Sequence, residues 1–145
     1  MKIKLHVTKE SLCAGSACTS GFQKLLEWHA DRHIHLEYNT PINLLTVLQS
    51  NGWIDMWWCF SCAIVAEDKP AAFEIVKELA KRYWKREGHS DQVIEEAFAN
   101  RIKNNYTLHN WLNHINQMAQ GVRDDLIDLL CNENRREKLL LLIAA

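Results

Sequence analysis

The chain has 145 residues, of which 48% are hydrophobic and 24% charged, and its formal net charge is −1. This composition excludes a disordered chain, and the near-zero charge excludes a global attraction to nucleic acid or anionic membranes. Only 2 prolines and 5 glycines are present, and so few helix breakers favour helices over a many-turned β fold. We therefore expect one mainly α domain spanning 1–145.

The cysteine count and the N-terminus indicate the cellular compartment. There are 5 cysteines, an odd number, and the first residues, M-K-I-K-L-H, lack the apolar stretch of a secretory signal. Both features predict a reduced protein of the cytoplasm. The apolar run 53–66 is too short for a bilayer and contains Asp55, so we expect no contact with a membrane.

The first elements are a strand and two helices. Polar and apolar side chains alternate over 2–7, which predicts a strand. A single strand needs a partner, either 34–38 or a second copy of the chain, so a homodimer is one expectation. Thr8 is the predicted N-cap of a short helix, and a capping-box spacing at Ser20 predicts a helix over 20–31.

The middle of the chain predicts two adjoining helices. Thr40 followed by Pro41 is typical of a helix start, and Asn51 followed by Gly52 is typical of a helix end. The run 53–66 is apolar on nearly all sides, which predicts an enclosed central helix.

The second half of the chain predicts a series of capped helices. They are expected from Pro70 to Gly88, from Ser90 to Asn104, from Thr107 to Gly121 and from Arg123 onward. The predicted fold is therefore mainly α: a single compact helical domain of about six to seven helices with a short N-terminal β element.

Four residues have the chemistry of a zinc site. Cys59 and Cys62 form a C-x-x-C, and His29 and His33 are one helical turn apart. Two thiolates and two imidazoles suit tetrahedral Zn²⁺. The C-x-x-C lies in an apolar helical run, however, where cysteines usually serve as small hydrophobic residues. We therefore expect no metal and no cofactor, with these four residues as weak candidate ligands, and a thioredoxin-like redox pair is disfavoured without a βαβ frame.

A cysteine nucleophile is the remaining enzymatic hypothesis. Cys13 and Cys18 flank small residues at the expected start of a helix, where the dipole lowers a thiol pKa. His6, His29 or His33 would be the base. No catalytic motif supports this hypothesis, and we expect no catalytic residues.

Aromatic and acidic side chains are candidates for binding a partner. Trp53 and Trp57 are four positions apart and share a helical face, whereas Trp58 points elsewhere, so one helix cannot easily bury all three against a single neighbour. They are either core residues packed on two sides or exposed anchors of an interface. Asp124, Asp125 and Asp128 form an acidic patch that could meet a basic groove on another protein.

A basic helical stripe supports a different function. Its members recur at helical spacing beside Trp84, with glutamates interleaved. Cations beside an aromatic ring suit nucleic-acid binding, although a solvated charged face has the same pattern. The stripe consists of Lys77, Lys81, Arg82, Lys85 and Arg86.

The first half of the chain carries three short patterns: T-x-x-x-L at 8–12, A-C-x-x-G at 17–21 and N-G-x-x-D-x-W at 51–57. Together they resemble a layout found in small phage and prophage proteins. The resemblance implies that Cys18 packs inward and that Gly21 permits a tight contact. It also implies an accessory factor that binds and inhibits host machinery, as anti-restriction and anti-CRISPR proteins do.

Two functions follow as expectations. The first is a phage-encoded, non-enzymatic protein in the host cytoplasm that binds and inhibits a host defence or nucleoprotein complex in an anti-CRISPR-like way. Its partner would be a host protein or a protein–nucleic-acid complex. The alternative is a small helical nucleic-acid-binding regulator that uses the basic stripe.

Overall fold

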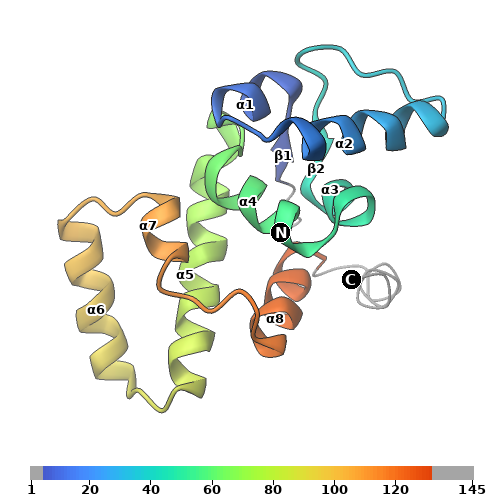
Figure 1. Ribbon diagram of the computed structural model, residues 1–145. Helices are drawn as coiled ribbons and strands as arrows, with labels where there is room; N and C mark the ends of the chain where they lie inside the picture. The colour runs from blue at the N-terminus through green and yellow to red at the C-terminus, as the bar shows by residue number, and fades with distance from the viewer. Residues whose placement is uncertain (1–4, 132–145) are drawn as a thin grey trace.

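The computed structural model describes residues 5–131. This part of the chain contains eight α-helices, one 3-10 turn and a two-stranded sheet (Figure 1). The predicted mainly α fold with a short N-terminal β element is therefore confirmed. The final helical segment expected from Arg123 onward is described only to Cys131, and its remainder lies outside the described residues.

The elements follow one another with short connections. In chain order they are β1 (His6–Val7), α1 (Lys9–Ala14), α2 (Thr19–Asp31), β2 (Ile42–Asn43), α3 (Leu44–Asn51), α4 (Trp53–Cys62), η1 (Ala66–Asp68), α5 (Lys69–Arg86), α6 (Asp91–Lys103), α7 (Leu108–Leu112) and α8 (Gln120–Leu130).

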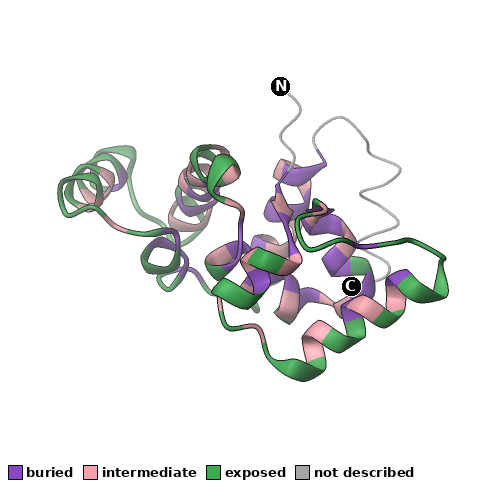
Figure 2. Ribbon diagram, turned by 90° about the horizontal axis from the view of Figure 1, so that it is seen from above, coloured by how far each residue is buried: buried purple, intermediate pink, exposed green. Residues whose placement is uncertain are grey.

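The long helix α5 organises the arrangement. It packs against α6, α7 and α8, while α3 packs against α2 and α4. In Figure 1, α1 to α4 lie on one side of α5, and α6 and α7 lie on the other. Figure 2 shows that buried residues gather where these groups meet, whereas α6 is mostly exposed. Ile94 is the one residue of α6 that is fully buried.

The strand pairing differs from the expectation. β1 pairs antiparallel with β2, with Val7 opposite Ile42, and not with 34–38. The same pairing explains why Thr40 does not cap a helix. The chain stays extended through Ile42 to complete the ladder, and Asn43 then caps α3 by accepting the Leu45 N–H at 2.9 Å.

The first two helices begin in different ways. Thr8 caps α1 as predicted, because its hydroxyl accepts the Ser11 N–H at 3.0 Å and Ser11 reciprocates at the Thr8 N–H. The predicted capping box at Ser20 is wrong. The N-cap of α2 is Cys18, which makes no side-chain capping bond.

Left-handed residues end several helices where predicted. Gly52 and Gly88 both have φ of +91°, and Asn105 has φ of +51°. Gly121 does not end a helix as expected, because it lies in the first turn of α8. A Cβ at Gly121 would lie 2.6 Å from Nη1 of Arg86. The absent side chain thus leaves room for that guanidinium.

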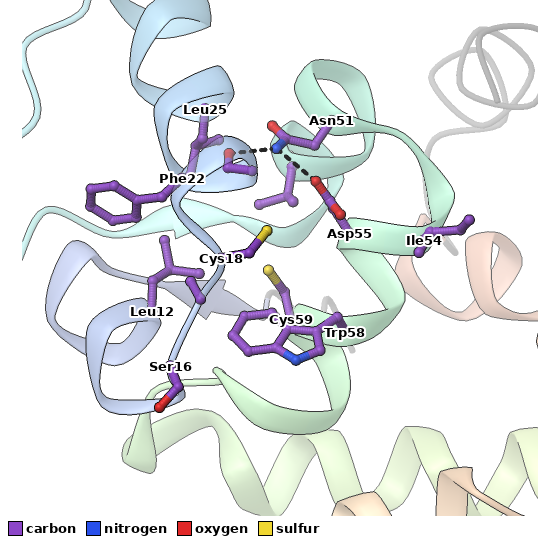
Figure 3. Close-up of a pocket in the computed structure, with 13 residues that line it drawn as sticks. Leu12, Ser16, Cys18, Phe22, Leu25, Asn51, Ile54, Asp55, Trp58 and Cys59 are labelled. Carbon is purple, nitrogen blue, oxygen red and sulfur yellow. Dashed lines mark hydrogen bonds between the residues drawn. The ribbon is translucent and has the colours of Figure 1, made fainter.

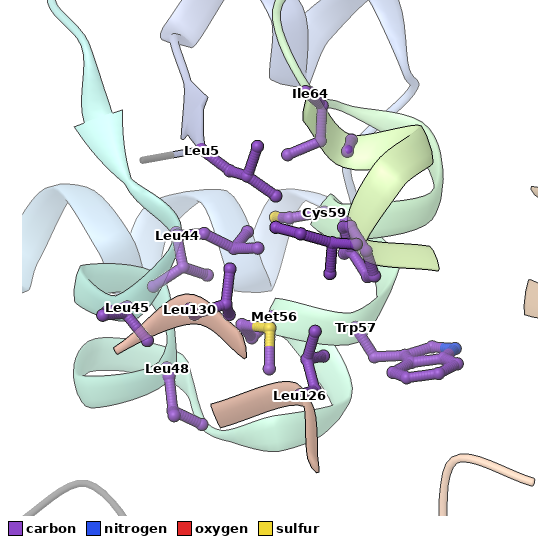
Figure 4. Packing of buried hydrophobic residues seen from close by; sticks show 14 of the residues in the cluster. Leu5, Leu44, Leu45, Leu48, Met56, Trp57, Cys59, Ile64, Leu126 and Leu130 are labelled. Carbon is purple, nitrogen blue, oxygen red and sulfur yellow. The ribbon is translucent and has the colours of Figure 1, made fainter. Parts of the chain in front are cut away.

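One hydrophobic cluster extends from Leu5 to Cys131 through the described elements. Figure 4 shows Leu44 of α3, Met56 of α4 and Leu126 of α8 converging in it. Phe60 of α4 is also fully buried. Burial of apolar side chains is the main favourable contribution to the stability of a domain. The buried side chains of α4 therefore hold this helix in place.

Candidate functional site

The predicted acidic and basic residues meet in one ion-pair network between α5 and α8. Arg86 Nη2 donates to Oδ1 of Asp125 at 2.9 Å, and Arg82 Nη1 donates to Oδ2 of Asp128 at 3.3 Å. Arg82 also donates to Glu78 on its own helix at 3.2 Å. The hydrogen bond to Asp125 raises the pKa of Arg86 above its ordinary value.

This network corrects the expected surfaces. Asp125 is only 8% exposed, so it is not part of an open acidic patch. Arg82 and Arg86 are already neutralised by carboxylates of α8 and do not extend an open basic stripe. Asp124 is partly buried and accepts a hydrogen bond from Gln120 at 2.9 Å. The two surfaces expected to act separately are largely turned toward each other.

The lysines of the stripe lie on the solvated side of α5. Lys77 pairs with Glu74 at 3.4 Å, and Lys85 pairs with Asp91 at 3.2 Å. Within residues 5–131, Lys81 is the stripe lysine that makes no ion pair. Because acidic residues alternate with these lysines, this side of α5 is a mixed charged face. Exposed ion pairs of this kind contribute little to stability.

The two candidate tryptophans have different surroundings. Trp57 is 7% exposed, and its ring centroid lies 5.7 Å from that of Trp53 and 6.3 Å from that of Phe60. Of the two alternatives left open for Trp57, it is therefore a core residue and not an exposed anchor of an interface. Trp58 is only partly buried and lines a groove on the surface.

The candidate zinc ligands are not brought together. His29 is buried, and its Nδ1 donates to the Leu25 carbonyl at 2.8 Å. His33 lies past the end of α2 with φ of +57°, so the two imidazoles do not share a helical face. Cys59 is buried and Cys62 is exposed. Within residues 5–131, no three His, Cys, Asp or Glu side chains are grouped to hold a metal ion.

A hollow of about 250 Å³ lies between the N-terminal helices, and we call it the N-terminal groove (Figure 3). Its walls come from α1 and the turn after it, from α2, α3 and α4. Most of its lining side chains are apolar. The lining residues are Leu12, Ser16, Ala17, Cys18, Gly21, Phe22, Leu25, Val47, Asn51, Ile54, Asp55, Trp58 and Cys59.

A small polar network fixes one end of the groove. Asn51 Nδ2 donates to the Gly21 carbonyl at 2.8 Å and to Oδ2 of Asp55 at 3.0 Å. A Cβ at Gly21 would lie 3.1 Å from this carboxylate oxygen and 3.1 Å from Cys18 Sγ. Gly21 thus makes the close contact that was expected, and it brings Asp55 to the first turn of α2.

The position of Asp55 has an electrostatic consequence. The first turn of α2 contains no acidic residue, and its N-cap provides no side-chain bond. A carboxylate beside the positive end of the helix dipole is favourable there. Asp55 therefore places a carboxylate at the N-terminal end of α2, in a groove whose other lining residues are apolar or uncharged.

The groove contains two cysteines, Cys18 and Cys59, and Cys18 does not pack inward as expected. Cys18 is exposed and faces the groove, so it does not pack into the core. Cys59 extends from the opposite wall (Figure 3). Burial, with smaller contributions from Asp55 and Cys62, raises the pKa of the Cys59 thiol to about 12. Cys59 is therefore a neutral apolar surface and not a nucleophile.

Of the groove residues, Trp58 alone was a candidate for partner binding, and the sequence singled out neither Ile54 nor Asp55. Ile54 is 64% exposed at the rim, although it lies in an apolar run predicted to be enclosed. The only signal was that Asp55 interrupts this run. Arranged in this way, the groove can bind an apolar group that carries a cation or a hydrogen-bond donor at one end.

Comparison with protein-family models, curated proteins and solved structures finds no match to this chain. No helix within residues 5–131 combines the length and the hydropathy that a bilayer span needs.

Proposed function

We propose that this chain is a non-enzymatic binding protein that holds an apolar side chain of a protein partner in the N-terminal groove. The observation that carries the proposal is the groove itself, which is apolar, open to solvent and rimmed by Trp58 and Ile54. Exposed apolar surface that is concentrated in a groove is a common mark of an interaction site. Tryptophan is also over-represented among residues that dominate binding energy.

The size of the groove favours a protein side chain over a cofactor. Pockets for drug-sized ligands measure about 300–1,000 Å³, and this groove measures about 250 Å³. It can hold one or two apolar side chains, whose burial would provide about 1.5–3 kcal/mol each. The binding segment would therefore be short.

The charge in the groove specifies the partner further. Asp55 is the one charged residue among those that line it. A Lys or Arg next to the buried apolar side chain would pair with this carboxylate, and its alkyl stem could lie along the Trp58 ring. We therefore propose a partner segment in which an apolar residue adjoins a basic residue.

From the resemblance of the first half of the chain to small phage and prophage proteins, we further propose that the partner belongs to a host defence or nucleoprotein complex, which this chain inhibits by binding. Proteins that hold nucleic acid carry Lys and Arg on their binding surfaces, which supports this choice. The proposed partner thus keeps the anti-CRISPR-like function expected from the sequence. The proposed contact surface is now the N-terminal groove, in place of Asp125 and Trp57.

The alternative, a nucleic-acid-binding regulator, has weaker support. Binding to phosphates needs unpaired cations along a face, but Arg82 and Arg86 are paired with carboxylates of α8. It predicts a gel shift of DNA or RNA at low salt that Lys81→Glu abolishes. The groove proposal predicts no such shift.

Selection of random peptides on the full chain tests the proposal. We expect enrichment of sequences that place Leu, Ile, Phe or Met beside Lys or Arg. Ile54→Asp should weaken binding of the selected peptides by about 30-fold, because it replaces an apolar contact at the rim of the groove with a charge. Ile54 is exposed, so this change should leave the fold intact.

Ile102→Asp is the matched control. Ile102 is a helical isoleucine that is 59% exposed on α6, outside the groove. Peptide binding should be unchanged in this variant. The proposal is wrong if no peptide is enriched, if acidic peptides are preferred, or if both variants weaken binding equally.

A further inference from the structure

A second hollow, separate from the N-terminal groove, contains a thiol beside an imidazole. Cys62 is the last residue of α4, and His109 lies in α7, a helix that packs against α4. The Cys62 Sγ and His109 Nδ1 atoms are 3.9 Å apart, and both residues are exposed. Ser61 Oγ lies 3.2 Å from the same sulfur. These two residues are 47 positions apart in the sequence, so local spacing gives no sign that they lie together.

Lys69 is the one lysine or arginine that lines the hollow around this pair. The hollow measures about 340 Å³, and its lining includes Lys69, Phe73, Tyr106 and His109. No Asp or Glu occurs among its lining residues. An anionic molecule therefore fits this hollow better than a cationic one.

We propose that Cys62 is a modification site that exchanges with small anionic disulfides, of which oxidised glutathione is the common example, and that His109 is its proton acceptor. The proposal is independent of the binding function of the N-terminal groove. It assigns to the exposed member of the C-x-x-C a role that its buried member, Cys59, cannot have.

The proposed step balances in atoms and electrons. His109 Nδ1, in the tautomer that leaves this nitrogen unprotonated, takes the proton from Cys62 Sγ. The thiolate then attacks one sulfur of the disulfide, and a new Cys62 S–S bond forms as the original S–S bond breaks. The departing thiolate takes the electron pair of the broken bond and receives the proton from the imidazolium.

A base is required at this position. Cys62 lies at the C-terminal end of α4, where the negative end of the helix dipole opposes a resident thiolate. The neighbouring imidazole is the group that can offset this effect, since an adjacent His activates a thiol. Removing His109 should therefore slow the reaction at Cys62 selectively.

The other cysteines of the chain serve as internal comparisons. Cys13 and Cys18 are exposed like Cys62, and no imidazole contact to either occurs in the described part of the chain. Cys59 is buried, and its thiol pKa of about 12 keeps it neutral near physiological pH. A difference in reactivity among these four residues therefore isolates the effect of the hollow.

The experiment treats the full-length reduced protein with oxidised glutathione near neutral pH and maps each modified cysteine by mass spectrometry. We expect Cys62 to react about 10-fold faster than Cys13 or Cys18, with Cys59 unmodified. His109→Gln should lower the Cys62 rate to that of Cys13, and should change the pH profile of the Cys62 reaction but not that of Cys13. Far-ultraviolet circular dichroism checks that the variant is folded.

The anionic preference has its own control. Lys69→Gln should slow the reaction of Cys62 with oxidised glutathione but not with cystamine, a cationic disulfide. The proposal is overturned if Cys62 reacts no faster than Cys13, or if His109→Gln leaves its rate unchanged. Equal effects of Lys69→Gln on both reagents would overturn the selectivity for anions.

Discussion

Replacing Phe60 with Ala is expected to lower the free energy of unfolding by about 3–5 kcal/mol. Phe60 is 0% exposed and packs edge-on against Trp57 at a centroid distance of 6.3 Å. Its removal would leave a cavity at the inner face of α4, the helix whose outer face forms part of the N-terminal groove. Urea-induced unfolding, followed by tryptophan fluorescence, measures the change.

Ile54→Ala is the control on the same helix. Ile54 is exposed at the rim of the groove, so its truncation should change the free energy of unfolding by less than about 0.5 kcal/mol. A similar loss in both variants would mean that α4 does not pack with Phe60 inward and Ile54 outward. The assignment of the groove face would then be wrong.

Replacing Arg86 with Met is expected to destabilise the fold by about 2 kcal/mol. Met keeps the apolar stem of Arg86 but removes the guanidinium that binds buried Asp125. Loss of one partner of a fully buried pair costs about 3–5 kcal/mol, and the partial exposure of Arg86 reduces this cost. Arg82, with Nη1 at 3.7 Å from Asp125, compensates for part of the loss.

Lys85→Met is the control for Arg86→Met, because it removes a cation from the same end of α5 but not the partner of a buried carboxylate. Lys85 pairs with exposed Asp91 at 3.2 Å, and such a surface pair contributes about 0–1 kcal/mol. Thermal or urea unfolding should therefore separate the two variants clearly. Equal stability of both would show that Asp125 is solvated and that the charges of α5 remain available to a ligand.

Local signals in the sequence predicted many of the helix ends. Thr8, Ser90 and Thr107 each cap a helix as predicted, and their hydroxyls accept backbone N–H groups. Gly52 ends α3 because it can adopt a positive φ. A helix cap and a left-handed glycine depend only on residues that are close in the sequence, so a single sequence is enough to predict them.

Tertiary contacts changed the predictions that failed. Thr40 and Pro41 have the pattern of a helix start, but pairing of β2 with β1 keeps the chain extended as far as Asn43. Glycine is typical of a helix end, yet Gly121 lies in the first turn of α8, against the guanidinium of Arg86. Neither contact can be seen from local spacing.

The candidate site was predictable only in part. Trp58 was named from the sequence, but helical spacing could not show that Trp57 faces the core and Ile54 the solvent, because the whole run is apolar. The basic residues of α5 and the acidic residues of α8 were each interpreted as an exposed binding surface. Their pairing depends on how two helices more than 30 positions apart pack together.

The measurement that tests the groove most directly is a ¹H–¹⁵N spectrum of the tryptophan indoles during titration with the tightest selected peptide. The chain has 6 tryptophans, and Trp53 provides a reference because its Nε1–H donates to the Gln117 carbonyl at 2.9 Å inside the fold. We expect the Trp58 indole signal to shift and saturate, while those of Trp53 and Trp84 stay in place. A static Trp58 signal, or a shift instead at Trp84, which lies outside the groove, would contradict the proposed binding site.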